Sequence, residues 1–252
     1  MNKDLLPRQF ALDIAQAPKP SLSNFLTGEN AALHSTLQDV VKAWELKQAR
    51  PAGENALNQR WMYWWGAEGS GRTHLLDSLA NAAQVLGFQH FALNPNEPST
   101  WVKLEDQLTN LGASHSASVI TVDDVDCLND RLVASLFRIL NAVQASQAMY
   151  IFMAGNAAPG ALKLREDLRT RLGWGLVFQT HALGDDEKIQ ALEQSAQARG
   201  LVLSPEVLPW LLNHFYRDMP SLMALIDALD AYSLETKRAV TLPLVRTLLE
   251  TK

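Results

Sequence analysis

Short apolar runs alternate with longer, helix-periodic segments between about residues 25 and 182 of this chain. Five runs predict buried strands, at 60–65, 88–93, 118–125, 148–155 and 175–180. Apolar residues recur at helical spacing in four further segments, at 30–48, 73–86, 98–111 and 130–145. Strands that are separated by helices favour a largely parallel sheet with helices on both faces. We therefore expect an α/β domain built on a parallel five-stranded sheet.

The pattern changes after Gly184, because no strong strand candidate follows it. Asp185 is expected to cap a helix that Gly200 ends, and three further helix starts are expected at Ser204-Pro205, Met219-Pro220 and Thr241-Leu242-Pro243. The chain is therefore expected to consist of a polar tail (1–20), an α/β domain (21–183) and a small all-α domain (184–252).

Composition limits the classes of protein to which the chain can belong. A net charge of -5 over 252 residues argues against a protein that coats nucleic acid by charge alone. The sequence contains no run of 18 apolar residues and no signal peptide, so we expect no membrane partner. Cys127 is the single cysteine, which excludes an internal disulfide and a cysteine-built metal site and makes the cytoplasm the expected location.

A glycine-rich segment, GAEGSGRTH, follows the first apolar run and opens a helix. It matches the phosphate-loop pattern G-x-x-x-x-G-K-[ST] at Gly66, Gly71 and Thr73, with Arg72 where the lysine is expected. Glycines let successive N–H groups point at phosphate oxygens, but arginine does not replace lysine conservatively. We expect nucleotide binding to survive better than turnover, and a turn without a ligand is the alternative. The candidate contacts are Gly66, Glu68, Gly69, Ser70, Gly71, Arg72, Thr73 and His74.

A pair of aspartates ends the third predicted strand, in VITVDDVD. Asp123 is expected at the carboxyl edge of the sheet beside the phosphate loop, where it would hold the water shell of a Mg²⁺ ion to which Thr73 offers its hydroxyl. Asp124 occupies the position at which an active ATPase commonly has a glutamate that orients the attacking water. Because aspartate is one methylene shorter, its reach is in doubt. An acidic turn exposed to solvent is the alternative.

Arginines recur in the segment LREDLRTRLGWG, just before the fifth predicted strand. Arg165, Arg169 and Arg171 could simply form an exposed basic helix face. Their place before the last strand favours an interface instead, from which an arginine projects into a neighbouring protein's nucleotide site.

Taken in order, these motifs resemble the AAA+ proteins, and among them the family of the replication initiator DnaA and its shorter relatives, the Hda regulatory inactivators. The resemblance implies an AAA+ P-loop module with an all-α lid. It places Phe25, Gly28 and Asn30 near the adenine and Asn156 of MAGN near the terminal phosphate, as sensor 1. The box TRLGWGL assigns the arginine finger to Arg171. At sensor 2 the family's arginine aligns with Pro220, so Arg217, one turn upstream, is the candidate.

The predicted tail contains QFALDI (9–14), which resembles the peptide that binds the replicative sliding clamp. Gln9, Leu12 and Ile14 would fill the pocket of the clamp, and Phe10 stands where leucine is usual. A chance match in a polar tail is the alternative. The lid is expected to be the last domain, without the initiator's helix-turn-helix, so that DNA would be reached mainly through the clamp.

The resemblance implies a negative regulator of replication initiation. With ADP or ATP and Mg²⁺ bound, it would join the DNA polymerase III sliding clamp (beta subunit) and present Arg171 to DnaA-ATP, whose hydrolysis it stimulates. Its own ATPase activity is expected to be weak or absent, and a homodimer is left open. The second hypothesis is a self-sufficient ATPase, a DnaA paralogue that remodels or loads a replication protein. The third is a DNA-binding adaptor.

Overall fold

The computed structural model describes residues 19–46, 59–110, 117–146, 148–214, 219–236 and 239–250. The chain divides into two compact units after Leu183. One is an α/β unit and the other, from Gly184 onward, is helical. The clamp-peptide candidates Gln9, Phe10, Leu12 and Ile14 lie outside the described residues, as does Arg217.

The α/β unit is built on a five-stranded parallel sheet. Its strands are β1 (Trp61–Gly66), β2 (Gln89–Leu93), β3 (Ser118–Val122), β4 (Met149–Gly155) and β5 (Leu176–Thr180), in the order β2-β3-β4-β1-β5. The predicted fold class is therefore confirmed. Because all the strands are parallel, their carboxyl ends lie at one edge of the sheet, where the phosphate loop and the aspartate pair follow β1 and β3.

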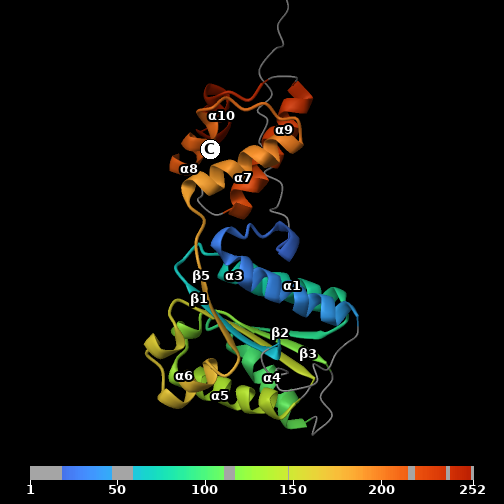
Figure 1. Ribbon diagram of the computed structural model, residues 1–252, viewed down its shortest axis with the longest axis vertical. Helices are drawn as coiled ribbons and strands as arrows, with labels where there is room; N and C mark the ends of the chain where they lie inside the picture. The colour runs from blue at the N-terminus through green and yellow to red at the C-terminus, as the bar shows by residue number, and fades with distance from the viewer. Residues whose placement is uncertain are drawn as a thin grey trace, which may run out of the picture. The chain divides into compact units, whose positions relative to one another are not determined.

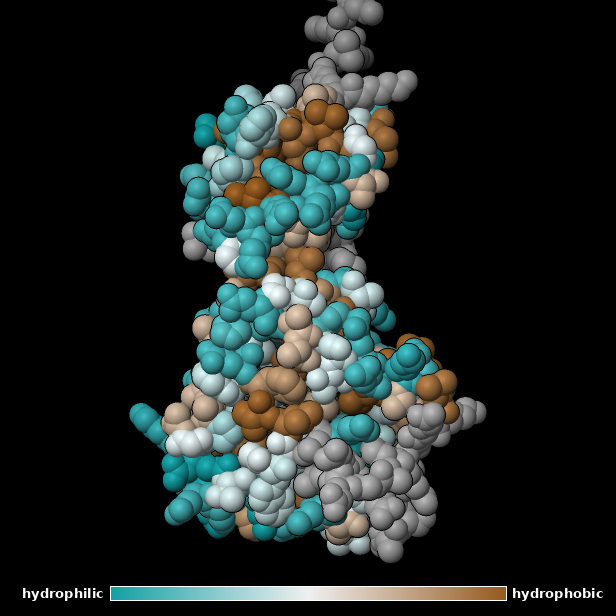
Figure 2. Space-filling view, viewed as in Figure 1, coloured by the Kyte–Doolittle hydropathy of each residue, from teal (hydrophilic) through white to brown (hydrophobic). Residues whose placement is uncertain are grey.

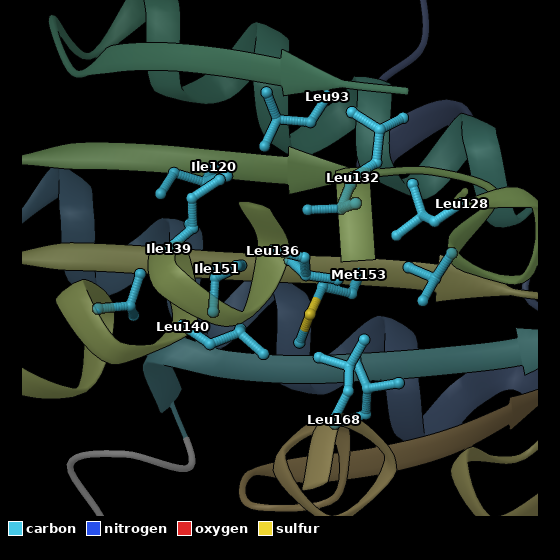
Figure 3. Packing of buried hydrophobic residues seen from close by; sticks show 14 of the residues in the cluster. Leu93, Ile120, Leu128, Leu132, Leu136, Ile139, Leu140, Ile151, Met153 and Leu168 are labelled. Atoms are coloured by element: carbon cyan, nitrogen blue, oxygen red, sulfur yellow. The ribbon is translucent and has the colours of Figure 1, made fainter. Parts of the chain in front are cut away.

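Helices cover both faces of this sheet (Figure 1). On one face lie α1 (Ala31–Glu45) and α3 (Arg72–Val85), preceded by the short helices η1 (Leu22–Asn24) and η2 (Gly28–Asn30). On the other lie α4 (Pro98–Asn110), α5 (Asp130–Ala145) and α6 (Glu166–Leu172), with the short helices η3 (Val125–Cys127) and η4 (Pro159–Ala161). Figure 3 shows the apolar side of α5, with Leu136, Ile139 and Leu140, against Ile151 and Met153 of β4.

The central strand β1 is buried on both faces. Trp61 and Tyr63 belong to the core under α4, α5 and α6, whereas Met62 and Trp64 belong to the core under α1 and α3. Side chains alternate across a strand, so four consecutive buried residues require cover on both sides. The edge strand β5 is more open. Val177 is exposed, and Figure 2 shows apolar residues at the surface near β5.

The helical unit contains α7 (Asp185–Ala198), α8 (Val207–His214), α9 (Met219–Thr236) and α10 (Leu242–Glu250) around an apolar core of its own. Asp185 was predicted as the cap of α7, but it is the first helical residue. Gly184 is the N-cap, and its N–H donates to the Glu187 carboxylate at 2.7 Å. Sequence patterns also missed an isolated bridge between Leu203 and Val240. Within the described ranges, no helix has the length and apolar character needed to cross a membrane.

Candidate functional site

The glycine-rich loop joins the end of β1 to the start of α3 by a turn that only glycines allow. Gly69 and Gly71 have φ values of 79° and 84°, in the left-handed region that side chains disfavour. A Cβ on Gly66 would lie 2.3 Å from both the carbonyl oxygen and Oγ1 of Thr180. The loop therefore lies directly against the end of β5, with its backbone bent as a phosphate loop requires.

The polar side chains of the loop differ in their surroundings. Ser70 is buried, and its hydroxyl lies 2.8 Å from Thr180 Oγ1, so it fastens the loop to β5. Glu68 is exposed at the tip of the loop. Of these two predicted contacts, only Glu68 has a solvent-exposed side chain.

Arg72 directs its charge toward the acidic edge of the sheet. Its carbonyl accepts a hydrogen bond from Trp64 Nε1 at 3.3 Å, which fixes the start of α3. Its positive charge lowers the pKa of Asp124, against the larger opposing effect of burial. Its Nη1 is buried and has no hydrogen-bond partner in the part of the chain that the structure describes. A buried donor without an acceptor is costly, so this nitrogen suits an anionic ligand at the loop.

The two predicted metal-site residues lie in contact. Thr73 Oγ1 donates to Asp123 Oδ2 at 2.7 Å, and the Asp124 N–H donates to Asp123 Oδ1 at 2.9 Å. Among the described residues, no group of three or more His, Cys, Asp or Glu side chains is arranged to hold a metal ion. A hydroxyl and one carboxylate fit a cation such as Mg²⁺ that takes its remaining ligands from phosphate and water.

Asp124 has the only positive φ of a residue other than glycine in the described ranges, with φ and ψ both 48°. Aspartate tolerates this left-handed conformation better than most residues, but such strain clusters at functional sites. Burial raises the pKa of Asp124, and the charges of Asp123 and Asp126 raise it further. The turn therefore presents a carboxyl group with increased affinity for a proton.

Asn156 is the first residue after β4, and its side chain is exposed at the same edge. Its N–H donates to Asp126 Oδ1 at 2.8 Å, and Tyr63 Oη donates to the carbonyl of Ala157 at 2.6 Å. Sequence analysis missed both partners. The third aspartate in VDDVD was a signal for Asp126, whereas a tyrosine inside an apolar run gave no signal for Tyr63.

The segment before α1 packs against the phosphate loop. Phe25 stacks on His34 at 5.7 Å and lies at a tilt to His74 at 5.7 Å, and a Cβ on Gly71 would lie 2.6 Å from Phe25 Cε2. The imidazole Nε2 atoms of His34 and His74 bond the carbonyls of Leu22 and Ser21. Phe25 and His74 are thus brought together at the loop, and His34 joins them without having been predicted.

Asn30 and Gly28 shape this entry segment. The Asn30 amide is buried, with Nδ2 donating to the His181 carbonyl and Oδ1 accepting from the His181 N–H, both at 2.8 Å. Both of its polar atoms are therefore engaged by the chain that follows β5, so the amide anchors the segment. Gly28 begins η2 with φ 45°.

Arg171 lies on the face formed by α5 and α6. Its guanidinium carbon is 3.8 Å from the ring centre of Phe137 and 4.8 Å from that of Trp174, and it donates to Asn141 Oδ1. Arg165 pairs with Asp167 at 2.6 Å, and its guanidinium carbon lies 5.8 Å from the ring centre of Phe137, whereas Arg169 donates to the Gly160 carbonyl at 3.1 Å. Of the three predicted arginines, Arg171 is the one held between two aromatic rings.

This face lies at the amino end of β1. The Trp174 ring is 5.7 Å from that of Trp61, and a Cβ on Gly175 would lie 1.8 Å from the Trp61 carbonyl oxygen. Trp61 is the first residue of β1 and Gly66 the last. Since β1 has six residues, its two ends lie about 16 Å apart. Arg171 and the phosphate loop therefore belong to opposite ends of the strand.

Comparison with known proteins gives relatives over most of the chain. A family model of the Hda lid domain matches residues 185–249. An uncharacterised protein from Haemophilus influenzae is 30% identical over 245 residues, which cover 96% of this chain and 98% of that protein.

Three solved structures share the fold. Domain III of Thermotoga maritima DnaA has a TM-score of 0.60 at 18% identity, with 92% of this chain and 98% of that chain covered. DnaA from Aquifex aeolicus bound to AMPPCP has a TM-score of 0.60 at 21% identity, covering 88% and 68%. The T. maritima RuvB branch migration motor has a TM-score of 0.60 at 15% identity, covering 93% and 72%.

At these identities the likeness to DnaA and RuvB shows the AAA+ fold alone. The match to the Hda lid domain identifies the family of the helical unit. The similarity to the H. influenzae protein covers 96% of this chain and therefore includes both domains. This chain belongs to the Hda-like, DnaA-related AAA+ proteins.

Proposed function

We propose that this protein binds an adenine nucleotide, ADP or ATP, with Mg²⁺ at the carboxyl edge of its sheet. Support comes from the buried Arg72 Nη1 without an acceptor and from the Thr73–Asp123 pair. Support also comes from AMPPCP in the DnaA of similar fold. The phosphate loop from Gly66 to Thr73 would hold the phosphates, and Thr73 and Asp123 would hold the cation, whose charge would offset that of the phosphates.

The protein's own turnover is expected to be slow. Arginine is longer than lysine and has a planar, forked head, so it does not supply the same compact charge at the phosphates. Asp124 is shorter than the glutamate of an active ATPase. Nucleotide therefore serves mainly to stabilise one conformation of the protein, because a ligand that binds the folded state stabilises it by mass action.

We propose further that the protein is a negative regulator of replication initiation. Bound to the DNA-loaded sliding clamp, it presents Arg171 to ATP held by DnaA and stimulates hydrolysis of that ATP. Hydrolysis of a phosphoanhydride is limited by stabilising the charge of the transition state, and an arginine supplied by a partner accelerates it by roughly 10³–10⁵-fold in other systems.

The observation that carries this proposal is the separation of Arg171 from the protein's own phosphate loop. Arg171 packs beside the amino end of β1 and the phosphate loop follows its carboxyl end, and these two ends of the strand are about 16 Å apart. An arginine side chain is too short to span that distance. Arg171 therefore cannot serve the nucleotide bound by its own chain, and a second protein's nucleotide is the substrate that it can reach.

The decisive experiment measures hydrolysis of DnaA-bound ATP with and without this protein and with and without DNA-loaded clamp. We expect fast hydrolysis only when both are present. Hydrolysis at the rate of DnaA alone in the complete mixture would contradict the proposal.

The clamp contact is proposed for residues 9–14, which lie outside the described residues. The double change Gln9→Ala, Leu12→Ala should abolish clamp binding and clamp-dependent stimulation while leaving the melting temperature and nucleotide affinity unchanged, because a short peptide would fill a preformed groove. Undiminished clamp binding would mean that the contact lies elsewhere. Sedimentation of the protein alone tests whether it forms a homodimer.

A self-sufficient ATPase is the second candidate. The short side chain of Asp124 counts against it, but the conformation and surroundings of this residue favour it. Its left-handed backbone and raised pKa are typical of a residue held for proton transfer. Purified protein that hydrolyses ATP at roughly 1 s⁻¹ or faster, with the activity abolished by Asp123→Ala, would support this candidate over the regulatory one.

A further inference from the structure

Four consecutive backbone carbonyls before α1, those of residues 19–22, each bond a side-chain nitrogen. In chain order these nitrogens belong to Asn24, Asn81, His74 and His34, at 3.0, 2.9, 3.2 and 2.7 Å. A carbonyl oxygen only accepts hydrogen bonds, so both imidazole rings carry a proton on Nε2. His34 belongs to α1, whereas His74 and Asn81 belong to α3. The chain is therefore fastened to two different helices at residues 19–22.

Phe25, three residues further on, lies directly on the phosphate loop. Its Cε2 atom is 2.6 Å from the position that a Cβ on Gly71 would take. Its ring centre lies 5.7 Å from those of both His34 and His74. Gly71 is the last loop residue before α3 and has φ 84°. The Phe25 ring therefore closes off one side of the backbone at the point where the loop passes into the helix.

His74 connects the loop to residues 19–25. It lies in the first turn of α3, which begins at Arg72 directly after the last glycine of the loop. The half-buried ring of His74 contacts Phe25, and its Nε2 bonds the Ser21 carbonyl. Displacing the start of α3 therefore breaks contacts with residues 19–25.

Asn81 fastens the same segment from a position remote from the loop. It lies nine residues after Arg72 in α3, which places it about 13 Å further along the helix axis. Its side chain is half-buried, and its Nδ2 donates to the Pro20 carbonyl. A side chain at this distance cannot touch a phosphate group in the loop. An effect of Asn81 on the loop would therefore have to pass through residues 19–25 or along α3, and variants can separate these two routes.

We propose that residues 19–25 hold the phosphate loop in its nucleotide-binding conformation before a nucleotide arrives, with His34, Asn81 and Phe25 as positioning residues. The inference rests on the proposed nucleotide site. A loop that is already bent binds phosphate without a further loss of conformational entropy, so this preorganisation increases affinity. By linkage, a nucleotide that needs the bent loop must also make residues 19–25 harder to release.

The test measures amide hydrogen exchange in the full-length protein without ligand. Two amides, those of Ser70 and Leu75, report opening of the loop, because their N–H groups donate to loop carbonyls at 3.2 and 3.0 Å. Asn81→Ala should speed exchange at both amides by about fivefold, the effect of losing one hydrogen bond. Exchange at Ile120 in the buried strand β3 should be unchanged, because the fold as a whole is not affected.

Two further variants are the controls for Asn81→Ala. Asn81→Asp keeps the size of the side chain but places an acceptor against the Pro20 carbonyl, so it should speed exchange at least as much. Gln84→Ala removes an exposed amide side chain about one turn further along α3 and should leave exchange unchanged. Unchanged exchange at the two loop amides in Asn81→Ala, or an equal increase at Ile120, would overturn the inference.

A double-mutant cycle shows whether the effect passes through Phe25 or along α3. Phe25→Ala removes the ring from Gly71 and should by itself speed exchange at the two loop amides. Asn81→Ala should then have a smaller effect in the Phe25→Ala background than in the wild type. An effect of the same size in both backgrounds would mean that Asn81 acts along α3 and would overturn the inference.

The second readout is the response of residues 19–25 to ADP with Mg²⁺, with binding followed by calorimetry. Bound ADP should slow exchange at Asn24, whose N–H donates to the Ser21 carbonyl at 3.2 Å. ADP that binds without slowing this amide would overturn the inference. Wild-type protein that binds no ADP would instead contradict the proposed nucleotide site, and exchange in the free protein would still decide whether residues 19–25 hold the loop.

Discussion

The carboxyl edge of the sheet and the face formed by α5 and α6 hold their candidate functional groups by different means. At the edge, backbone geometry does the holding, with glycines at 66, 69 and 71 and a left-handed Asp124. On the α5–α6 face, side chains hold Arg171 between the rings of Phe137 and Trp174. The first arrangement depends on the absence of side chains and the second on their presence.

This difference determines how each region fails. At Gly66 the phosphate loop has no spare volume, so adding one methyl group there displaces backbone that no rotamer can relieve. A guanidinium between two rings gains cation–π attraction, about 0.5–2 kcal/mol, without straining the backbone. Changes on the α5–α6 face should therefore alter activity with a loss of unfolding free energy of at most about 2 kcal/mol, whereas changes at a tightly packed position of the loop should alter both strongly.

The largest effect is expected from Arg171→Ala. Stimulation of DnaA-ATP hydrolysis should fall by about 10³-fold, because the transition-state charge loses its partner. Folding, nucleotide affinity and clamp binding should be unchanged, since Arg171 is remote from the phosphate loop. Hydrolysis assays and thermal unfolding on the same preparations check both parts.

Arg165→Ala is the matched control for that variant. Arg165 is exposed and pairs with Asp167 on the surface, where such pairs contribute little. If Arg171→Ala stimulates DnaA-ATP hydrolysis normally and Arg165→Ala does not, Arg165 is the arginine finger. The contrast between the two regions would then not hold.

A smaller but broader effect is expected from Gly66→Ala. The new Cβ would lie 2.3 Å from two atoms of Thr180, so unfolding free energy should fall by about 3 kcal/mol and nucleotide affinity should fall with it. Gly69→Ala meets no atom within 4 Å and costs only its left-handed conformation, about 1 kcal/mol. Denaturant titration compares the two variants, and equal losses would show that the close packing at Gly66 costs no more than the left-handed conformation of Gly69.

The same contrast explains what the sequence could predict. The spacing of Gly66 and Gly71 predicts the phosphate loop, because glycines at these positions allow the backbone conformation that the loop needs. Phe137 and Asn141 gave no local signal for their contacts with Arg171, since helical periodicity does not show which arginine thirty residues later will pack on them. Asp126 was missed for a related reason, because its partner Asn156 is fixed only by the pairing of β3 with β4.

Errors in the helical unit have a local cause. Asp185 matches the preferred N-cap residues, but the extended backbone of Gly184, at φ -65° and ψ 161°, already provides the cap, with Glu187 accepting its N–H. The bridge between Leu203 and Val240 joins single residues, and a single pair leaves no periodic pattern in a sequence.

Thr73→Val should have a smaller effect than Gly66→Ala. It removes the hydroxyl that meets Asp123, so the enhancement of nucleotide affinity by Mg²⁺ should fall by about tenfold while affinity in EDTA is unchanged. Thr36→Val, whose hydroxyl bonds only the Ala32 carbonyl one turn earlier in α1, is the control. A loss that persists in EDTA would mean that Thr73 supports the loop and not the cation.

The smallest effect is expected from pH, and it should come from buried histidines and not from the α5–α6 face. Burial lowers the pKa of His74 below its ordinary 6.5, outweighing the Ser21 carbonyl and the charge of Asp77, which raise it. As pH falls through 6.5, the unfolded chain therefore takes up a proton that the folded protein resists, and unfolding free energy decreases.

His90, whose pKa burial also lowers, acts in the same direction, so a single variant should leave part of the slope. His74→Gln should flatten the dependence of unfolding free energy between about pH 7.5 and 5.5, and adding His90→Gln should flatten it further. The raised pKa values of Asp77 and Asp124 act in the opposite sense at lower pH, which sets the lower limit of the titration. Because α5 and α6 contain no histidine, a pH dependence that survives both substitutions would have to come from a titrating group other than His74 and His90.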